Sequence, residues 1–175
     1  SDPDAALYWL VRMLRSGEDP MFLARRLVRM ASEDIGLADP NALRLALAAK
    51  DSMHFLGAPE GELALAEIAI YLAVTPKSNA VYKAFKEVNK LVQSGVAHDV
   101  PMQLRNAPTK LMQNKGWGQG HEYAHDNAHG ITAMDCLPDA LVGSKFYKPT
   151  RYGVEERITK RLELIARLKA TAEKS

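Results

Sequence analysis

The stretch LALAEIAIYLAV, at Leu63–Val74, constrains the fold most strongly, because Glu67 is the only charged residue that interrupts it. A surface helix shows an apolar stripe and a polar face, whereas a helix that is apolar all round is enclosed. The run lacks the period-two alternation of a half-buried strand, and it is shorter than the roughly 20 apolar residues that cross a bilayer. Pro59 suits a first helical turn, and Pro76 ends the helix. We therefore predict a central helix that is buried on all sides.

Glu67 is the exception within this helix, and two interpretations of it stay open. In the first, it lies at the rim of the core or pairs with an Arg or Lys, because an unpaired buried charge is very costly. In the second, it forms a buried ion pair between helices or between subunits.

The residues before the central helix repeat one helix-start signal. An Asp that can accept a capping hydrogen bond is followed by a proline at the first helical position, and this pair occurs at Asp2-Pro3, Asp19-Pro20 and Asp39-Pro40. Glycines end the segments that follow, at Gly17, Gly36 and Gly57. Helices joined by such short turns pack as antiparallel or steeply crossed pairs. The pattern therefore predicts three helices before the central one.

A fifth helix is predicted between Ser78, which can cap it, and Gly95. Its inner stripe is predicted at Val81, Phe85, Val88 and Val92, which recur at helical spacing. We therefore predict an all-helical core over residues 1–95. Its buried side chains are expected to include Leu27, Leu65, Ile68, Leu72, Val81 and Phe85.

After Gly95 the chain is rich in Gly, Pro, Asn and His, and helical periodicity fades. We predict an irregular segment at residues 96–149 that packs on the core, with a short helix near Ala107–Lys115 and a small hairpin between Tyr123 and Tyr147. A C-terminal helix is predicted at residues 150–175. The expected fold class is all-α: a helical bundle of short hairpin-connected helices with an irregular wrapping segment and a C-terminal helix.

Composition narrows the classes of protein that fit. A chain of 175 residues holds one or two domains and needs no disulfide or metal to fold. Its formal net charge of +2 by itself favours neither nucleic acid nor membrane. The single cysteine, Cys136, excludes an internal disulfide and suits a reducing compartment. Because the chain opens at Ser1 without a methionine, at a helix start, we expect a piece of a longer protein whose chemistry lies elsewhere.

A short match to a zinc protease motif occurs at His121-Glu122-Tyr123-Ala124-His125. That chemistry needs a helix, so that two histidines one turn apart share a face and the glutamate acts as the base. Glycines surround the motif; His129 would extend its spacing, and Asp126 and Cys136 are possible further ligands. We predict no metal site and no catalytic residue, and a zinc hydrolase is the least favoured alternative.

The glycine-rich run Gly116–Gly120 resembles a nucleotide loop only superficially, because no strand precedes it and no phosphate-loop motif follows. We expect it to be a turn that lets Trp117 pack.

Two basic helix faces are candidates for contact with nucleic-acid phosphates. One is formed by Arg25, Arg26 and Arg29, and the other by Lys83, Lys86 and Lys90. The alternative is a solvated face with salt bridges to Glu33 and Glu87. No recognition motif is present, so sequence-specific readout of bases is not expected.

Several colinear stretches resemble one family. They are SDPDAALYWLVRML at Ser1–Leu14, EDPMFLARRLVRMASEDIGLADP at Glu18–Pro40, GELALAEIAIYLAVTPKSNAVYKAF at Gly61–Phe85, LRNAPTKLM at Leu104–Met112 and YAHD at Tyr123–Asp126. Together they resemble the C-terminal region of the replication-associated recombination protein A family, which is related to the Werner helicase-interacting ATPase. The resemblance covers essentially the whole chain.

The resemblance implies a function that the residues alone do not. Full-length members are AAA+ ATPases related to clamp loaders, which act on DNA in replication, recombination and repair at stalled forks, associate with single-stranded-DNA-binding protein and form homotetramers. This chain would then be the helical collar, or oligomerisation domain, of a bacterial, cytoplasmic, nucleoid-associated protein. No cofactor is expected here, because ATP and magnesium belong to the ATPase domain, and no membrane partner is expected. The alternative is a monomeric helical module that contacts DNA.

Overall fold

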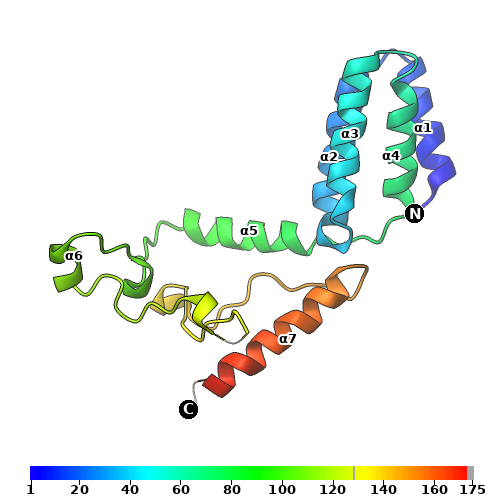
Figure 1. Ribbon diagram of the computed structural model, residues 1–175. Coiled ribbons are helices and arrows are strands. Elements are labelled where there is room, and N and C mark those ends of the chain that lie inside the picture. The colour runs from blue at the N-terminus through cyan, green and yellow to red at the C-terminus, as the bar shows by residue number, and fades with distance from the viewer. Residues whose placement is uncertain (128, 173–175) are drawn as a thin grey trace. The chain divides into compact units, whose positions relative to one another are not determined.

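The computed structural model describes residues 1–127 and 129–172, and within these ranges the chain contains helices, turns and loops but no strand (Figure 1). The prediction of an all-α fold is therefore confirmed. The longer helices are α1 (Pro3–Arg15), α2 (Pro20–Met30), α3 (Asn41–Leu56), α4 (Glu62–Val74), α5 (Ala80–Gln93) and α7 (Glu155–Ala172), with a short α6 at Lys110–Asn114. A π-helical turn (Ala31–Ile35) extends α2, and 3-10 turns lie at Gly36–Ala38, Met102–Leu104, Ala124–Asp126 and Asp139–Leu141.

Two of the three Asp-Pro signals begin helices as predicted, with Pro3 and Pro20 as the first helical residues of α1 and α2. The Asp2 carboxylate accepts a hydrogen bond from the Ala5 amide at 2.9 Å, and the Asp19 carboxylate accepts one from the Met21 amide at 2.9 Å. At the third signal the Asp39 carboxylate accepts from the Asn41 amide at 3.0 Å, but α3 begins at Asn41, so Pro40 precedes the helix instead of opening it. Each cap satisfies an amide that would otherwise lack a partner in the first helical turn.

The chain divides into two compact units. The first contains residues 1–86 and 147–159, and the second contains residues 87–146 and 160–175. The division predicted from the sequence, at residues 1–95, 96–149 and 150–175, stays a prediction.

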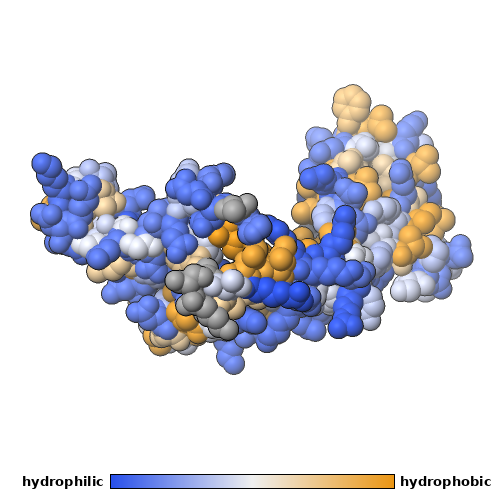
Figure 2. All heavy atoms as spheres, turned by 60° about the horizontal axis from the view of Figure 1, so that its bottom comes forward, coloured by the Kyte–Doolittle hydropathy of each residue, from blue (hydrophilic) through white to orange (hydrophobic). Residues whose placement is uncertain are grey.

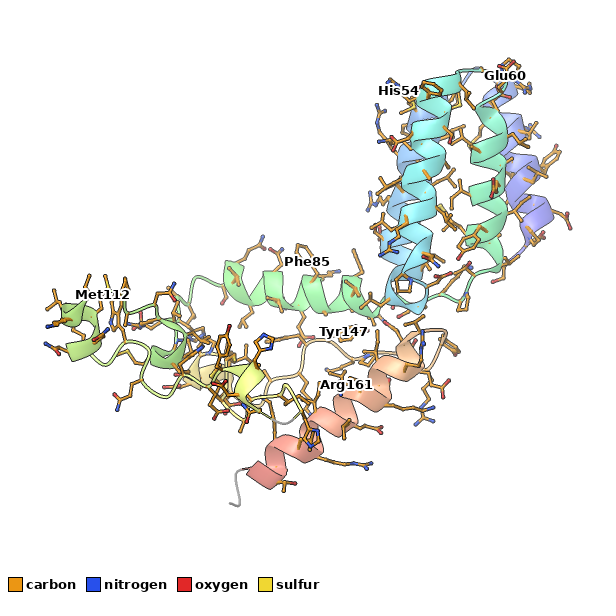
Figure 3. All side chains as sticks on the ribbon, viewed as in Figure 1. His54, Glu60, Phe85, Met112, Tyr147 and Arg161 are labelled. Carbon is orange, nitrogen blue, oxygen red and sulfur yellow. The ribbon has the colours of Figure 1, made fainter. Side chains whose placement is uncertain are left out.

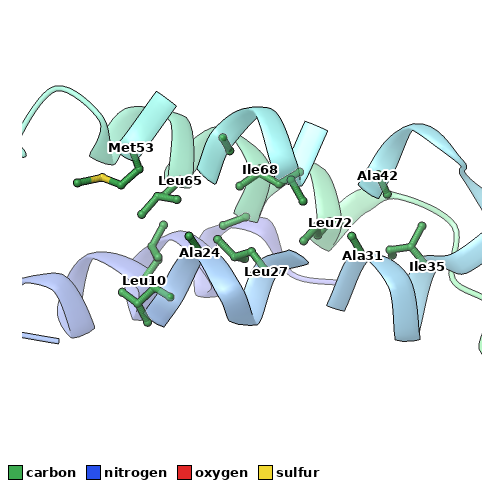
Figure 4. Packing of buried hydrophobic residues seen from close by; sticks show 14 of the residues in the cluster. Leu10, Ala24, Leu27, Ala31, Ile35, Ala42, Met53, Leu65, Ile68 and Leu72 are labelled. Carbon is green, nitrogen blue, oxygen red and sulfur yellow. The ribbon is translucent and has the colours of Figure 1, made fainter. Parts of the chain in front are cut away.

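In the first unit, α4 packs against α1 and α3, and α2 packs against α3. The core lies between these four helices, as Figure 4 shows, and the predicted core residues Leu27, Leu65, Ile68 and Leu72 are buried in it. Small side chains at Ala24, Ala42, Ala46 and Ala69 fill the rest of the contact. Close packing of this kind makes the loss of even a few methylene groups costly.

Two predictions about burial are wrong. The first is that the central helix α4 is enclosed on all sides, since one of its faces is open to solvent in the single chain. The second concerns α5, where Val81 is 38% exposed and Phe85 is 70% exposed. Phe85 is labelled on α5 in Figure 3. The physical reason is that α5 packs closely against no other described helix, so its apolar stripe is left uncovered.

The sequence also misplaced two elements of the later chain. The hairpin predicted between Tyr123 and Tyr147 is absent from the described residues, which form short 3-10 turns and loops instead. This segment lacks the alternation of apolar residues that a paired strand requires. The C-terminal helix begins at Glu155 rather than near Thr150, because the Thr150 amide and hydroxyl bind the Glu155 carboxylate. The short helix near Ala107–Lys115 is confirmed by α6.

Residues 147–159 are bound tightly to the rest of the first unit. The Val154 amide donates to the Ala38 carbonyl at 2.8 Å. Gly153 has φ +55°, and a Cβ added there would lie 2.1 Å from the Ala38 oxygen. Only glycine allows the two backbones to approach this closely.

The Glu155 carboxylate lies at the centre of this contact and is 0% exposed. It accepts hydrogen bonds from the Thr150 amide and hydroxyl, both at 2.7 Å, from the Tyr147 hydroxyl at 2.9 Å and from Ser78. Burial alone would raise the pKa of Glu155, but these hydrogen bonds together lower it below its ordinary value. The carboxylate is therefore kept ionised, and burial together with its hydrogen bond raises the pKa of Tyr147.

The second unit is held by hydrogen bonds between side chains and backbone. The Gln103 amide nitrogen donates to the Asp135 carbonyl at 2.6 Å, and the Lys169 ammonium donates to the Met134 carbonyl at 3.2 Å. None of the described side chains of this unit is fully buried. Its order therefore depends on polar contacts more than on an apolar core.

Candidate self-association and nucleic-acid surfaces

One face of α4 carries apolar residues that are open to solvent in the single chain. Leu63, Glu67, Ile70 and Val74 recur along it at helical spacing, and all four are exposed. Leu63 is 75% exposed and Val74 is 63% exposed, whereas Leu65 and Leu72 on the opposite side are buried. Figure 2 shows that apolar residues reach the surface in several patches. We call these four residues the outer face of α4.

Glu67 lies within this outer face and is exposed in the single chain. The position agrees with the first interpretation drawn from the sequence, in which the carboxylate lies at the rim of the core. An ion pair with a second subunit stays a prediction.

An apolar groove lies beside the core, between α1 and α2. These two helices follow one another in sequence but contact each other little, so α4 forms the floor between them. The groove has a volume of about 450 Å3, with Leu10 and Met13 on one wall and Leu27 and Met30 on the other. Nothing in the sequence indicated that α1 and α2 would stay apart.

Helix α5 separates its apolar and basic residues on opposite sides. Val81, Phe85, Val88 and Val92 recur at i, i+4, i+7 and i+11, which places them on one side of a helix. The predicted nucleic-acid residues Lys83, Lys86 and Lys90 fall on the other side, and all three are exposed. No ion pair involves these lysines within the described part of the chain. Their charges are therefore available to an anion.

The second predicted basic face, on α2, is largely neutralised by neighbouring acids. The Arg29 guanidinium binds the Glu33 carboxylate at 2.8 Å, which raises the pKa of Arg29. Arg25 lies 3.9 Å from Asp19. Arg26 lines the groove between α1 and α2. Of the two basic faces, the one on α5 therefore presents the larger unpaired charge.

The protease-like motif has no helical geometry. His121 and Glu122 lie in a loop, and a 3-10 turn carries His125. The His121 ring nitrogen Nδ1 lies 3.0 Å from the Gln103 carbonyl, and the Glu122 carboxylate accepts from the Ala133 amide at 2.9 Å. Both side chains thus have structural partners. Within residues 1–127 and 129–172, no group of three or more His, Cys, Asp or Glu side chains is placed to hold a metal ion.

The glycine-rich run forms the turn that we predicted. Gly116, Gly118 and Gly120 all have left-handed φ angles between +76° and +79°. The turn brings the Trp117 ring beneath the Arg105 guanidinium, 5.7 Å from the ring centroid. The run therefore positions an aromatic side chain.

Two polar contacts between residues far apart in the sequence were not predicted. Both terminal guanidinium nitrogens of Arg15 on α1 donate to the Glu62 carboxylate on α4, and this bidentate hydrogen bond raises the pKa of Arg15. The Tyr71 hydroxyl on α4 donates to Asp39, which raises the pKa of Tyr71. Each pair joins residues more than thirty positions apart, so local sequence patterns could not reveal it.

None of the described helices has the length and apolar character that a bilayer crossing requires.

Comparison with known proteins agrees with the resemblance seen in the sequence. Replication-associated recombination protein A of Coxiella burnetii is 52% identical over 169 residues, which cover 96% of this chain and 38% of the relative. The protein of the same name from Escherichia coli is 46% identical over 167 residues, or 95% of this chain and 37% of the relative. ATPase WRNIP1 of Dictyostelium discoideum is 43% identical over 161 residues, or 90% of this chain and 18% of the relative.

The chain thus spans less than two fifths of the length of these relatives. A family model described as MgsA AAA+ ATPase C terminal matches residues 1–166, which is nearly the whole chain. The all-helical fold is consistent with that match. The chain belongs to the MgsA AAA+ ATPase C-terminal family.

Proposed function

We propose that this chain is the self-association domain, or collar, of an AAA+ ATPase that acts on DNA in replication-associated recombination at stalled forks. The outer face of α4 is the observation that carries the proposal. The names of the relatives support the setting in replication and recombination.

A helix that is apolar all round is stable when every side is covered. In the single chain, α1, α2 and α3 cover part of α4 and leave Leu63, Ile70 and Val74 in water. A second copy of the chain supplies the missing cover, and identical subunits favour closed symmetry. We propose a homotetramer, in which each stable interface buries roughly 1,200–2,000 Å2 in total.

Light scattering tests the proposal with a pair of matched variants. Leu63→Glu introduces a charge on the outer face of α4 and is expected to reduce the mass of the assembly. Leu111→Glu makes the same change at a similarly exposed leucine in the second unit and should leave the mass unchanged. The wild-type chain is expected to be a multiple of 19.3 kDa. If the measured mass is that of one chain and stays the same when the protein is concentrated tenfold, the proposal of a self-association domain is refuted.

A second role, contact with DNA phosphates, is favoured by the unpaired lysines of α5. Several weak phosphate contacts repeated around an assembly give affinity that one patch lacks. The double variant Lys83→Gln with Lys86→Gln should weaken binding to duplex DNA, whereas Lys145→Gln with Lys148→Gln removes the same charge elsewhere. If the purified chain has the mass of one protomer and still binds DNA through these lysines, it is a monomeric DNA-contacting module.

The chemistry of the parent protein is assigned to the part outside this chain. We propose that ATP and magnesium bind there, that single-stranded-DNA-binding protein is a partner and that the parent works in the bacterial cytoplasm at the nucleoid. This chain is expected to hydrolyse no ATP by itself. Phosphate release by the purified chain, in proportion to its concentration, would contradict that assignment.

A further inference from the structure

A cationic stretch without acidic residues lies in the second unit. From Val100 to Gly120 the sequence contains Arg105, Lys110 and Lys115 but no Asp or Glu. Across the whole chain, acidic residues are almost as numerous as basic ones, at 21 against 23. The stretch therefore carries a net positive charge, although Asp99 just before it lies 4.0 Å from the Arg105 guanidinium. We call residues 100–120 the α6 tip.

Backbone hydrogen bonds fold the α6 tip onto itself. The Gly118 amide donates to the Met102 carbonyl at 2.8 Å, and the Trp117 amide donates to the Met112 carbonyl at 3.1 Å. The Gln113 side chain reaches the Ala107 carbonyl at 3.2 Å. A surface held in this way needs less ordering when a ligand binds than a free loop would need.

Two of the three cations are free to meet a ligand. Lys110 and Lys115 are exposed, and neither forms an ion pair within residues 1–127 and 129–172. Arg105 is different, because its Nε donates to the Val100 carbonyl at 2.7 Å and its guanidinium lies over Trp117. Arg105 therefore supports the tip, and the two lysines present its charge.

The exposed side of α6 combines these charges with a neutral polar side chain. Lys110, Leu111, Asn114 and Lys115 are all exposed, and helical spacing places Leu111 and Asn114 between the two lysines. Met112, labelled in Figure 3, is only partly exposed. Ammonium groups and amides are the side chains that contact phosphate and sugar oxygens in nucleic acids.

We propose that the α6 tip binds the phosphate backbone of nucleic acid through Lys110 and Lys115. This inference rests on the proposed action on DNA, but it is independent of self-association and of the lysines on α5. Nucleic acid is favoured over an anionic membrane because Leu111 is the only large apolar side chain on that side of α6. Membrane binding needs a much larger apolar face.

The salt dependence of binding tests the proposal. The double variant Lys110→Gln with Lys115→Gln is titrated with fluorescein-labelled oligothymidylate and with a labelled duplex at several salt concentrations. The slope of log K against log salt should become shallower by about 1.4 for the single strand or about 1.8 for the duplex, per protomer, because each phosphate contact contributes about 0.7 or 0.9. The two probes show which form of nucleic acid the tip prefers.

The matched control is Lys145→Gln with Lys148→Gln, which removes the same net charge at exposed positions outside the tip. An equal change of slope in this control, or no change in the tip variant, would overturn the proposal. If Lys83→Gln with Lys86→Gln abolishes binding while the tip variant binds like the wild type, DNA contact is assigned to α5 and the proposal for the α6 tip is overturned. Phosphatidylserine vesicles form the last arm, since loss of vesicle binding with unchanged oligonucleotide binding would assign the tip to membranes.

Discussion

The two compact units differ in what holds them together. In the described residues, the fully buried side chains all belong to the first unit, where α1–α4 enclose an apolar core. The second unit is organised by left-handed glycines and by hydrogen bonds to backbone carbonyls. Substitutions in the first unit should therefore act mainly on stability, and substitutions in the second mainly on binding.

The largest effect is expected in the core of the first unit. Leu72→Ala should lower the free energy of unfolding by about 2–5 kcal/mol, because it leaves a cavity among well-packed side chains. Urea denaturation measures this loss, and Leu63→Ala on the open face of the same helix is the control. A loss below about 0.5 kcal/mol for Leu72→Ala would mean that α4 is not the centre of the core.

The next effect is expected at the buried carboxylate. Glu155→Gln places an amide group opposite four donors, so it should lower the free energy of unfolding at neutral pH by about 1.5–3 kcal/mol. The folded-state pKa of Glu155 lies below the ordinary value of 4.5. The stabilisation is thus complete above pH 4.5 and is lost as the pH falls through the folded-state pKa.

Denaturant melts at a series of pH values test this dependence. The difference between the wild type and Glu155→Gln should shrink as the pH falls below 4.5. A difference that grows on acidification would contradict the ionised, hydrogen-bonded carboxylate.

A smaller effect is expected in the second unit. Trp117→Ala removes the contact with the Arg105 guanidinium, which is worth about 0.5–1 kcal/mol at an exposed site. The global unfolding transition should change by no more than this amount. Hydrogen exchange should instead show faster exchange of the Gly118 amide, and a loss as large as that of Leu72→Ala would remove the contrast between the units.

The smallest effect on the single chain is expected on the outer face of α4. Val74→Glu should change the stability of the dissociated chain by less than about 0.5 kcal/mol, because the side chain is already in water. In the wild type, the melting temperature should rise with protein concentration, because association stabilises the folded state. Val74→Glu should abolish that rise, and an unchanged concentration dependence would place the interface elsewhere.

The helices of the first unit could be predicted because their signals are local. Asp2 and Asp19 cap α1 and α2, and the proline after each of them predicted where these helices begin. Periodicity also revealed the apolar stripe of α5, but it cannot tell what covers a stripe, and Phe85 was therefore predicted to be buried. Glu155 gave no signal, because one of its hydrogen-bond donors, Ser78, is remote in sequence and a glutamate in a first helical turn is common.

The candidate binding surfaces likewise divide into those that local sequence patterns encode and those that depend on tertiary structure. Lys83, Lys86 and Lys90 could be recognised from their spacing on one helix. The α6 tip gives no comparable signal, because its basic residues are widely spaced in the sequence and its shape depends on glycine turns. The groove between α1 and α2 depends on how far apart two helices settle, which no local pattern encodes.

The contact between Gly153 and Ala38 bears on the order in which parts of the first unit fold during synthesis. The first unit is completed by residues 147–159, which leave the ribosome only after the whole of residues 87–146. Helices α1–α4 can pack together during synthesis. At that stage the Ala38 carbonyl has not yet accepted its hydrogen bond from the Val154 amide. The free-energy cost of closing this contact depends only weakly on the length of the segment between the two residues, since doubling the length of a flexible loop costs only about 0.6 kcal/mol. Residues 87–146 could thus grow or shrink through evolution while the bundle kept its closing segment.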